Sequence, residues 1–429
     1  MATKDRRANS LAKVDAITKS NPFFEIIGEC RLVHRWLESK SDKSVWLLLK
    51  LLDGVFRGFS QVVFANNTLS GLFVIIGLGV ADISVCAAGL LAATLATVTA
   101  SVFNQPWSSI SNGLVTYNGV LVGTVTASIC PPIVVATNGP AYLSWCLIGF
   151  GGVMSALVTS GMANLCKGAS LPPMTVPFNL IDLLLFICLP SALTHLAPTV
   201  SAQNATTFNL AASNNDSLIV LNATVPVITE LELDWIMVLR GSLVSMGQVY
   251  AVESIVCSII MYMGITMFSP MLSIALYGGS LLASVCALGL TDNYGAIYSG
   301  LWGYNSALTA GAIAVTFYIP TLLSVFNAAM AIVFTAAAQR AFGLVLAPAG
   351  LPILTIPFVV TSSMFWRLVL APAGLPILTI PFVVTSSMFL AVTSGAGFER
   401  LIKAPDGRPP EHQRRRYKKS TIQSEACDV

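Results

Sequence analysis

The sequence predicts an all-α integral membrane protein in which one multi-helix unit occurs twice. Of its 429 residues, 55% are hydrophobic and only 10% are charged, whereas a soluble domain has about 25% charged residues. The mean hydropathy is +0.76. The run at 69–103 is too long and too apolar for a soluble core. Such a run suits helices that cross a hydrocarbon layer ~30 Å thick.

Three motifs occur in both halves of the chain, in the same order. FRGFSQVV at 56–63 returns loosely as LRGSLVSMGQVY at 239–250, and NGLVTYN at 112–118 returns as SGLWGYN at 299–305. LPPMTVPF at 171–178 returns as LPILTIPF at 351–358. The spacing between copies is nearly constant for three matched pairs, Gln61 and Gln248, Tyr117 and Tyr304, and Thr175 and Thr355. Polar motifs broken by Gly or Pro at matching places predict a transport site where two repeats meet.

Charge and glycosylation signals predict the orientation. Lys and Arg concentrate at the two ends of the chain, which predicts a cytosolic N-terminal segment at 1–43 and a basic cytosolic tail at 399–429. The polar loop at 199–234 carries three N-x-[ST] sequons, which predicts an extracellular, glycosylated loop; the acceptors are Asn204, Asn215 and Asn222. Each half then has an odd number of spans, so the second repeat lies inverted in the membrane.

The first repeat, 44–198, divides into five predicted spans and one re-entrant helix. The spans are expected at about 44–66, 68–85, 83–104, 141–166 and 175–198. The segment near 110–131 is interrupted by glycines and closed by Pro131 and Pro132. It is therefore expected to be re-entrant, because irregular backbone at membrane depth is tolerated only where it is buried or lines a cavity.

The second repeat, 235–398, is expected to follow the same plan. Its spans are predicted near 239–262, 252–270, 270–290, 319–342 and 376–396, with the re-entrant helix near 300–317. The segment at 344–365 recurs letter for letter at 368–389. It is a recent duplication or an error in the gene model. Spacing from Gln248 favours Thr355 in the first copy as the partner of Thr175, with Thr379 in the second copy as the rival.

These motifs resemble the urea transporter family over roughly 20–400. The resemblance rests on RGFSQVVFANNTLSG at 57–71, the two G-L-x-x-Y-N segments, GQVY at 247–250 and the paired L-P-x-x-T-x-P-F motifs. It implies two inverted five-span halves, a homotrimer with one pore per protomer, and passive permeation of urea across the plasma membrane. The chain departs from the family at Asn67-Thr68 and Glu253-Ser254, where Asn-Pro is usual.

The resemblance also implies residue roles. Gln61, Gln248, Thr175 and Thr355 fall on polar pore-lining positions, and Phe64 falls on an aromatic one; Tyr250 is a weaker pore candidate. A threonine in a membrane helix more often bonds its own backbone, and a buried glutamine often joins helices, so the matched pairs carry the prediction. Re-entrant backbone is expected to be held by Tyr117, Asn118, Tyr304 and Asn305.

The chemistry of urea fits such a site. Urea is flat, neutral and small, so it needs a thin slot with apolar faces and oxygen acceptors along its edge, and pseudo-symmetry would make the two threonines equivalent. Weak binding without fixed charge allows release.

Other classes of protein remain as alternatives. An ion-coupled carrier would need a carboxylate at membrane depth. Five acids are considered, most of them near expected span ends, with Glu253 as the foremost candidate: Asp53, Asp82, Asp182, Glu253 and Asp292. An ammonia or water channel of the same architecture is the other alternative. No enzyme motif, cofactor or metal site is predicted, and the short basic tail run predicts no nucleic-acid partner.

Overall fold

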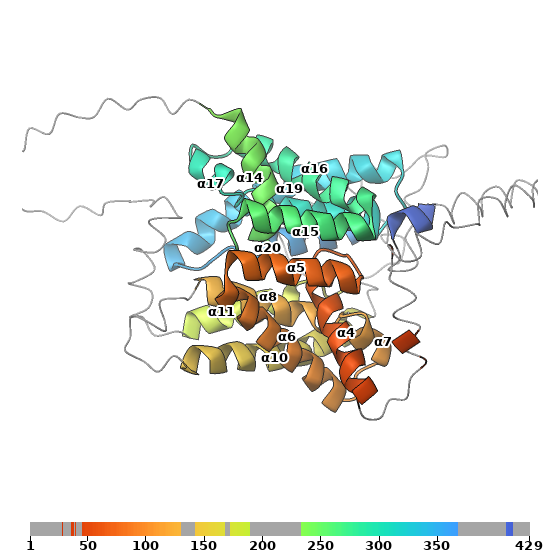
Figure 1. Ribbon diagram of the computed structural model, residues 1–429. Helices are drawn as coiled ribbons and strands as arrows, with labels where there is room; N and C mark the ends of the chain where they lie inside the picture. The colour runs from red at the N-terminus through yellow and green to blue at the C-terminus, as the bar shows by residue number, and fades with distance from the viewer. Residues whose placement is uncertain are drawn as a thin grey trace, which may run out of the picture.

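The part of the chain that can be described is helical. The computed structural model describes residue 28, residues 36–37, residue 39, and residues 45–129, 142–167, 172–188, 233–367 and 409–414. The helices fall into two series that occupy two layers, orange to yellow below and green to blue above in Figure 1. The first series is α4 (Val45–Gln61), α5 (Thr68–Ala81), α6 (Ile83–Val102), α7 (Trp107–Ser111), α8 (Tyr117–Ile129), α10 (Tyr142–Lys167) and α11 (Val176–Cys188).

The second series runs in the same order. It consists of α14 (Trp235–Gln248), α15 (Ile255–Phe268), α16 (Pro270–Leu288), α17 (Tyr294–Tyr298), α18 (Tyr304–Ala310), the π-helix η1 (Gly311–Thr316), α19 (Leu322–Leu346), the 3-10 turn η2 (Ala347–Ala349) and α20 (Ile356–Arg367). From α5 to α8, the first residue of each helix precedes that of its counterpart in the second series by one constant offset. For α11 and α20 the offset is slightly shorter.

The helix starts at matching places are fixed by side-chain caps. Asn67 and Ser254 cap α5 and α15, while Asp82 and Ser269 cap α6 and α16, each accepting backbone N–H groups of the first turn. Such caps satisfy backbone donors that would otherwise lack partners. The helices before these caps end sooner than the sequence predicted.

The break between α14 and α15 shows why the predicted overlap of 239–262 and 252–270 is wrong. Ala251 has a φ of 59° and its counterpart Phe64 a φ of 64°. The Val252 N–H then returns to the Gly247 carbonyl at 3.1 Å. A residue with this left-handed backbone cannot continue a helix, so two separate helices form.

The two layers meet along α5 and α15 (Figure 1). Ser70 Oγ donates to the Gly264 carbonyl at 2.7 Å. A Cβ built on Gly77 would lie 3.1 Å from the Cys257 carbonyl. Residues 70 and 257 are equivalent in the two series, as are 77 and 264, so the contacts are reciprocal. Across these two contacts the residue number increases along α5 and decreases along α15, so the two helices are antiparallel.

The outer surface is apolar. Large hydrophobic side chains are exposed on most long helices, for example Leu322 at 86% and Leu165 at 78%. Within the described ranges, four helices are long and apolar enough to cross a membrane: Ile83–Val102, Ser144–Cys166, Pro270–Leu288 and Leu322–Ala349. Exposed apolar surface of this extent and helices of this length are those of a membrane protein.

Several predicted elements differ from the observed ones or lie elsewhere. The 14 residues of α5 extend about 21 Å, less than a full hydrocarbon layer. The helix that matches α11 is α20, formed by the first copy of the duplicated segment. The span expected at 376–396 lies outside the described residues. So do most of 1–43, most of the 199–234 loop and most of the 399–429 tail.

Candidate functional site

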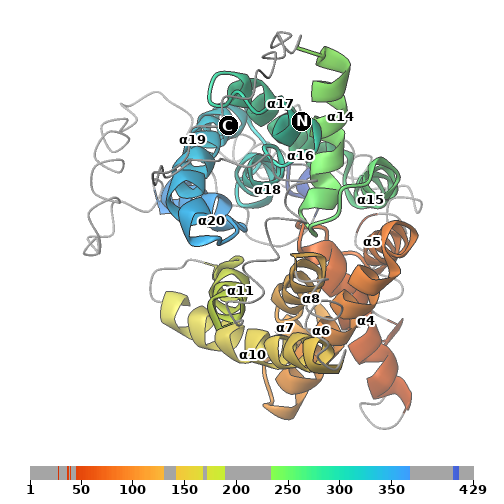
Figure 2. The same ribbon diagram turned by 90° about the vertical axis from the view of Figure 1, so that its left-hand side faces the viewer.

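The two motif threonines meet where the layers face each other. Thr175 and Thr355 immediately precede α11 and α20, which face one another across the boundary in Figure 2. Their hydroxyl oxygens are 2.7 Å apart and hydrogen-bonded. Both side chains are buried. Each threonine therefore contacts its own counterpart, as expected for residues on a two-fold axis between equivalent units.

In the first series, the start of α8 holds the threonine loop in place. The residue before Thr175 is Met174, which has a φ of 46°. Its carbonyl accepts a hydrogen bond from the Tyr117 hydroxyl at 2.5 Å and one from Asn118 Nδ2 at 3.3 Å. Asn118 Nδ2 also donates to Thr159 Oγ1 at 3.1 Å. These contacts stabilise a left-handed backbone that on its own costs about 1–3 kcal/mol.

The second series repeats this arrangement. Leu354 has a φ of 52°. Its carbonyl accepts from the Tyr304 hydroxyl at 2.6 Å and from Asn305 Nδ2 at 3.2 Å. Asn305 Nδ2 also donates to Gln339 Oε1 at 3.1 Å, where the first series has Thr159. The tyrosine–asparagine pairs thus tie the starts of α8 and α18 to the threonine loops.

The two candidate glutamines lie at the ends of α4 and α14, and their side chains are used differently. Gln248 Nε2 donates to the Ser299 carbonyl at 2.8 Å. The Oε1 atom of Gln61 is buried and has no hydrogen-bond partner among the described residues. A buried acceptor without a partner is uncommon, so Gln61 offers an unused oxygen close to the break between α4 and α5.

Aromatic rings from both layers gather at Phe64. Its ring centroid lies 5.9 Å from that of Phe317 in a T-shaped arrangement. It lies 6.1 Å from that of Phe358, which follows Thr355 on α20. Aromatic pairs at these separations are favourable. Phe64 is thus an apolar side chain close to α20, the helix that Thr355 immediately precedes.

Tyr250 contacts the opposite layer. It is completely buried, and its hydroxyl donates to the Phe59 carbonyl of α4 at 2.6 Å. This hydrogen bond joins the turn after α14 to a helix of the first series. The contact gives Tyr250 a structural task that its motif alone did not indicate.

Asn179 is a residue at the site that the sequence analysis missed. Its Oδ1 accepts from both the backbone N–H and the hydroxyl of Thr355, each at 3.0 Å. It lies one helical turn after Thr175 on α11. The corresponding position on α20, one turn after Thr355, is Val359, which has no polar side chain. The two threonines are therefore not equivalent, contrary to the expectation from pseudo-symmetry.

The acidic residues also differ from expectation. Asp182 lies within α11, completely buried, and accepts from Thr126 Oγ1 at 3.3 Å, while its Oδ2 has no partner in the part of the chain described. Asp53 is buried and paired with Arg57 at 2.9 Å. Glu253 lies 3.7 Å from Arg240, with both side chains about a third exposed. The sequence placed most of these acids near span ends, whereas the structure buries Asp53 and Asp182 and places arginines beside Asp53 and Glu253.

Thr379 and the sequon residues Asn204, Asn215 and Asn222 lie outside the described residues. Across the described ranges, no three His, Cys, Asp or Glu side chains are grouped as a metal site requires.

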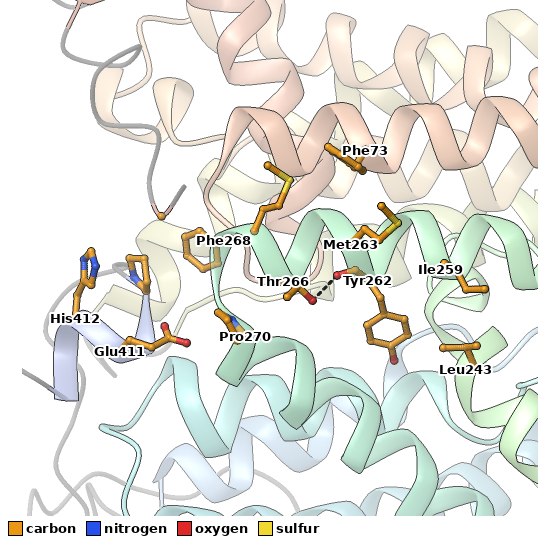
Figure 3. A pocket seen from close by; sticks show the side chains of 13 residues that line it. Phe73, Leu243, Ile259, Tyr262, Met263, Thr266, Phe268, Pro270, Glu411 and His412 are labelled. Carbon is orange, nitrogen blue, oxygen red and sulfur yellow. Dashed lines mark hydrogen bonds between the residues drawn. The ribbon is translucent and has the colours of Figure 1, made fainter. Parts of the chain in front are cut away.

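A cavity of about 720 Å³ lies at another place, along α15. Mostly apolar side chains line it, including Phe73, Ile259 and Met263, and the segment with Glu411 and His412 borders one end (Figure 3). The Glu411 carboxylate accepts from Ser269 Oγ at 2.7 Å and from the Met271 N–H at 3.0 Å. None of the described candidate pore residues lines this cavity.

Comparison with known proteins assigns the chain to a family. Residues 52–369 match the family model described as urea transporter. The chain belongs to the urea transporter family. It is 29% identical to urea transporter 1 of Ovis aries over 339 residues, which cover 79% of this chain and 80% of that protein. Over the same shares of both chains it is 29% identical to urea transporter 1 of Rattus norvegicus and 27% identical to that of Mus musculus.

The match spans both helical series, from α4 to α20. Family membership supports the transport of urea as the task of this membrane protein. The threonine pair, the Tyr–Asn pairs and the aromatic group all lie inside the matched range.

Proposed function

We propose that this chain is a channel-like transporter that carries urea passively across the plasma membrane, down the urea gradient. Membership in the urea transporter family supports the substrate, and the similar proteins from sheep, rat and mouse are named urea transporter 1. The single observation that carries the mechanism is the direct contact between Thr175 and Thr355 at the boundary of the two layers.

The groups around this contact suit a neutral solute. Among the described residues, the side chains that hydrogen-bond to the two threonine hydroxyls belong to Asn179 and to the threonines themselves, and all are uncharged. Hydroxyl lone pairs accept urea N–H groups, and the rings near Phe64 supply apolar surface for the flat face of urea. Neutral hydrogen bonds are modest in net strength, so a solute is bound briefly and released quickly.

We propose that the two helical series are inverted repeats, with the pore between them. The reciprocal contacts of α5 with α15 support a two-fold relation. The antiparallel direction of these helices supports an axis in the plane of the membrane, which inverts one repeat relative to the other. The division of each half, 44–198 and 235–398, into five spans and one re-entrant helix is part of this proposal, as is a homotrimer with one pore per protomer.

We further propose that both termini are cytosolic. Residue Gly28 accepts from Asn67 Nδ2 at the start of α5, and Glu411 caps α16 just after α15 ends. Because α5 and α15 are antiparallel, these two contacts lie at the same end of the pair, and Gly28 and Glu411 border the same cavity. The 199–234 loop is then extracellular. A glycosidase should increase gel mobility of the wild type but not of a triple Asn204→Gln, Asn215→Gln, Asn222→Gln variant.

The proposal takes Thr355, not Thr379, as the partner of Thr175. The first copy of the duplicated segment forms α20, and α20 begins as far after α11 as Thr355 lies after Thr175. A transcript that lacks one copy of the duplicated segment would identify the duplication as an artefact.

Uptake of radiolabelled urea into oocytes that express the chain tests the function. Uptake should follow the urea gradient and should not change when sodium, pH or membrane voltage is altered. Oocytes without the protein are the control. A steep dependence on any of the three would instead support an ion-coupled carrier, and permeation of ammonia or water without urea would support the other alternative.

A further inference from the structure

The hydrogen bonds at the threonine pair have a fixed direction. Each threonine hydroxyl has one proton. The Thr355 proton is donated to Asn179 Oδ1, so Thr355 must accept the proton of Thr175 in the bond between the two hydroxyls. The chain of donors therefore runs from Thr175 through Thr355 to Asn179.

In the proposed function urea passes between the layers at this threonine pair, and there the row of hydrogen bonds is a constriction. Two oxygen atoms 2.7 Å apart leave no room for a solute to pass between them. One of the hydroxyls must turn away before urea enters. Thr355 has two bonds to Asn179, one from its backbone N–H and one from its hydroxyl. The residue equivalent to Asn179 in the second half is Val359, whose side chain offers no acceptor.

We infer that Asn179 is a positioning residue that fixes Thr355, so that the constriction opens by movement of Thr175 alone. This inference rests on the proposed transport function and deepens it. One fixed wall and one mobile wall limit how far the slot widens. Asn179 thereby sets the size of the solute that passes, and discriminates urea from larger analogues such as thiourea.

The asymmetry of the two halves supplies a sharp test. Asn179→Val copies the residue of the second half into the first and removes the acceptor for Thr355. The Val359→Asn variant adds an acceptor beside Thr175. The double variant Asn179→Val/Val359→Asn moves the amide from one half to the other, and so exchanges which threonine is fixed.

The measurement is solute permeability of proteoliposomes for water, formamide, urea and thiourea. Loss of one hydrogen bond at the constriction should raise the thiourea-to-urea ratio of Asn179→Val about fivefold. The double variant should return the ratio toward that of the wild type. If Asn179 only stabilised the fold, an asparagine at position 359 could not substitute for it. A thiourea-to-urea ratio of the double variant that stays as high as that of Asn179→Val therefore overturns the inference.

Two further outcomes complete the test. If Asn179→Val does not fold, Val359→Asn alone should draw the Thr175 proton away from Thr355, which leaves no proton between the two hydroxyls, and should raise the thiourea-to-urea ratio; an unchanged ratio overturns the inference. Urea flux through the wild type tests the proposed function separately. If the wild type passes no urea, Asn179→Val should still admit the smallest solutes, and a variant closed to all of them contradicts the positioning role of Asn179.

Discussion

Replacing Thr355 with valine isolates the role of one hydroxyl. The Thr355→Val change keeps the branched shape and removes an oxygen that contacts Thr175 at 2.7 Å and Asn179 at 3.0 Å. Two effects oppose each other. Loss of the bond that closes the route makes opening easier by about 0.5–1.5 kcal/mol. Loss of an acceptor leaves a urea N–H unpaired in a desolvated slot, at about 1–3 kcal/mol.

The second effect is larger, so urea permeation should become slower. The difference of about 1 kcal/mol corresponds to roughly fivefold lower urea flux, if passage through this point limits the rate. Water does not need the same acceptor and gains from the easier opening, so water permeability should not fall. Stopped-flow measurement of both solutes on the same proteoliposomes gives the two values directly.

A matched control is Thr94→Val on α6, because Thr94 is exposed on the outer surface. This variant should retain both permeabilities. Size-exclusion chromatography of each variant shows that the protein is folded. Urea flux of Thr355→Val equal to that of Thr94→Val would refute the reasoning, and an equal fall for urea and water would mean general damage instead of a lost acceptor.

Two further changes test residues whose surroundings the structure revealed. Asp182→Asn removes a buried acid from α11; urea flux should persist and stay indifferent to pH, whereas loss of flux would implicate Asp182 in ion coupling. Tyr250→Phe removes the hydroxyl that bonds the Phe59 carbonyl at 2.6 Å, so the free energy of unfolding should fall by about 1 kcal/mol with urea flux per folded protein unchanged. A slower flux at unchanged thermal stability would place Tyr250 in the pore.

The sequence predicted the parts of the fold that depend on local chemistry repeated in both halves. The polar residues that end or begin helices recur at equivalent places in the two halves, as Asn67 and Ser254 do, and the helices recur with them. That the Tyr–Asn pairs hold re-entrant backbone stays a prediction; what the structure shows is that both pairs bond the carbonyls before the threonines. A residue type that recurs in the same context in both halves can be recognised from the amino-acid sequence alone.

Contacts between the two layers could not be predicted in this way. Asn179 reaches Thr355 across 176 residues of chain, and nothing in α11 alone indicates that partner. The contact also breaks the symmetry, because the residue equivalent to Asn179 is Val359. A prediction based on residues that match in the two halves therefore does not include Asn179. Asp182 was considered only as an acid near a span end, and its complete burial within α11 could not be predicted because the second half has Ser362 at its position.

The helix breaks were predicted less well than the helices. The apolar sequence continues across 249–252, but Ala251 takes a left-handed backbone and Ser254 caps the next helix. Alanine has no strong preference for such a conformation. The break is therefore set by tertiary contacts, including the bond between Tyr250 and Phe59, and not by the local sequence.

A reversible cross-link tests the central claim, that urea passes between the two halves at the threonine pair. In Thr175→Cys/Thr355→Cys, two sulfur atoms replace hydroxyls that are 2.7 Å apart, close to the ~2.05 Å of a disulfide. Oxidation should stop urea flux and a reductant should restore it, while both single variants stay active under the same treatment. A disulfide that forms, shown by mass spectrometry, while urea flux continues would contradict the account.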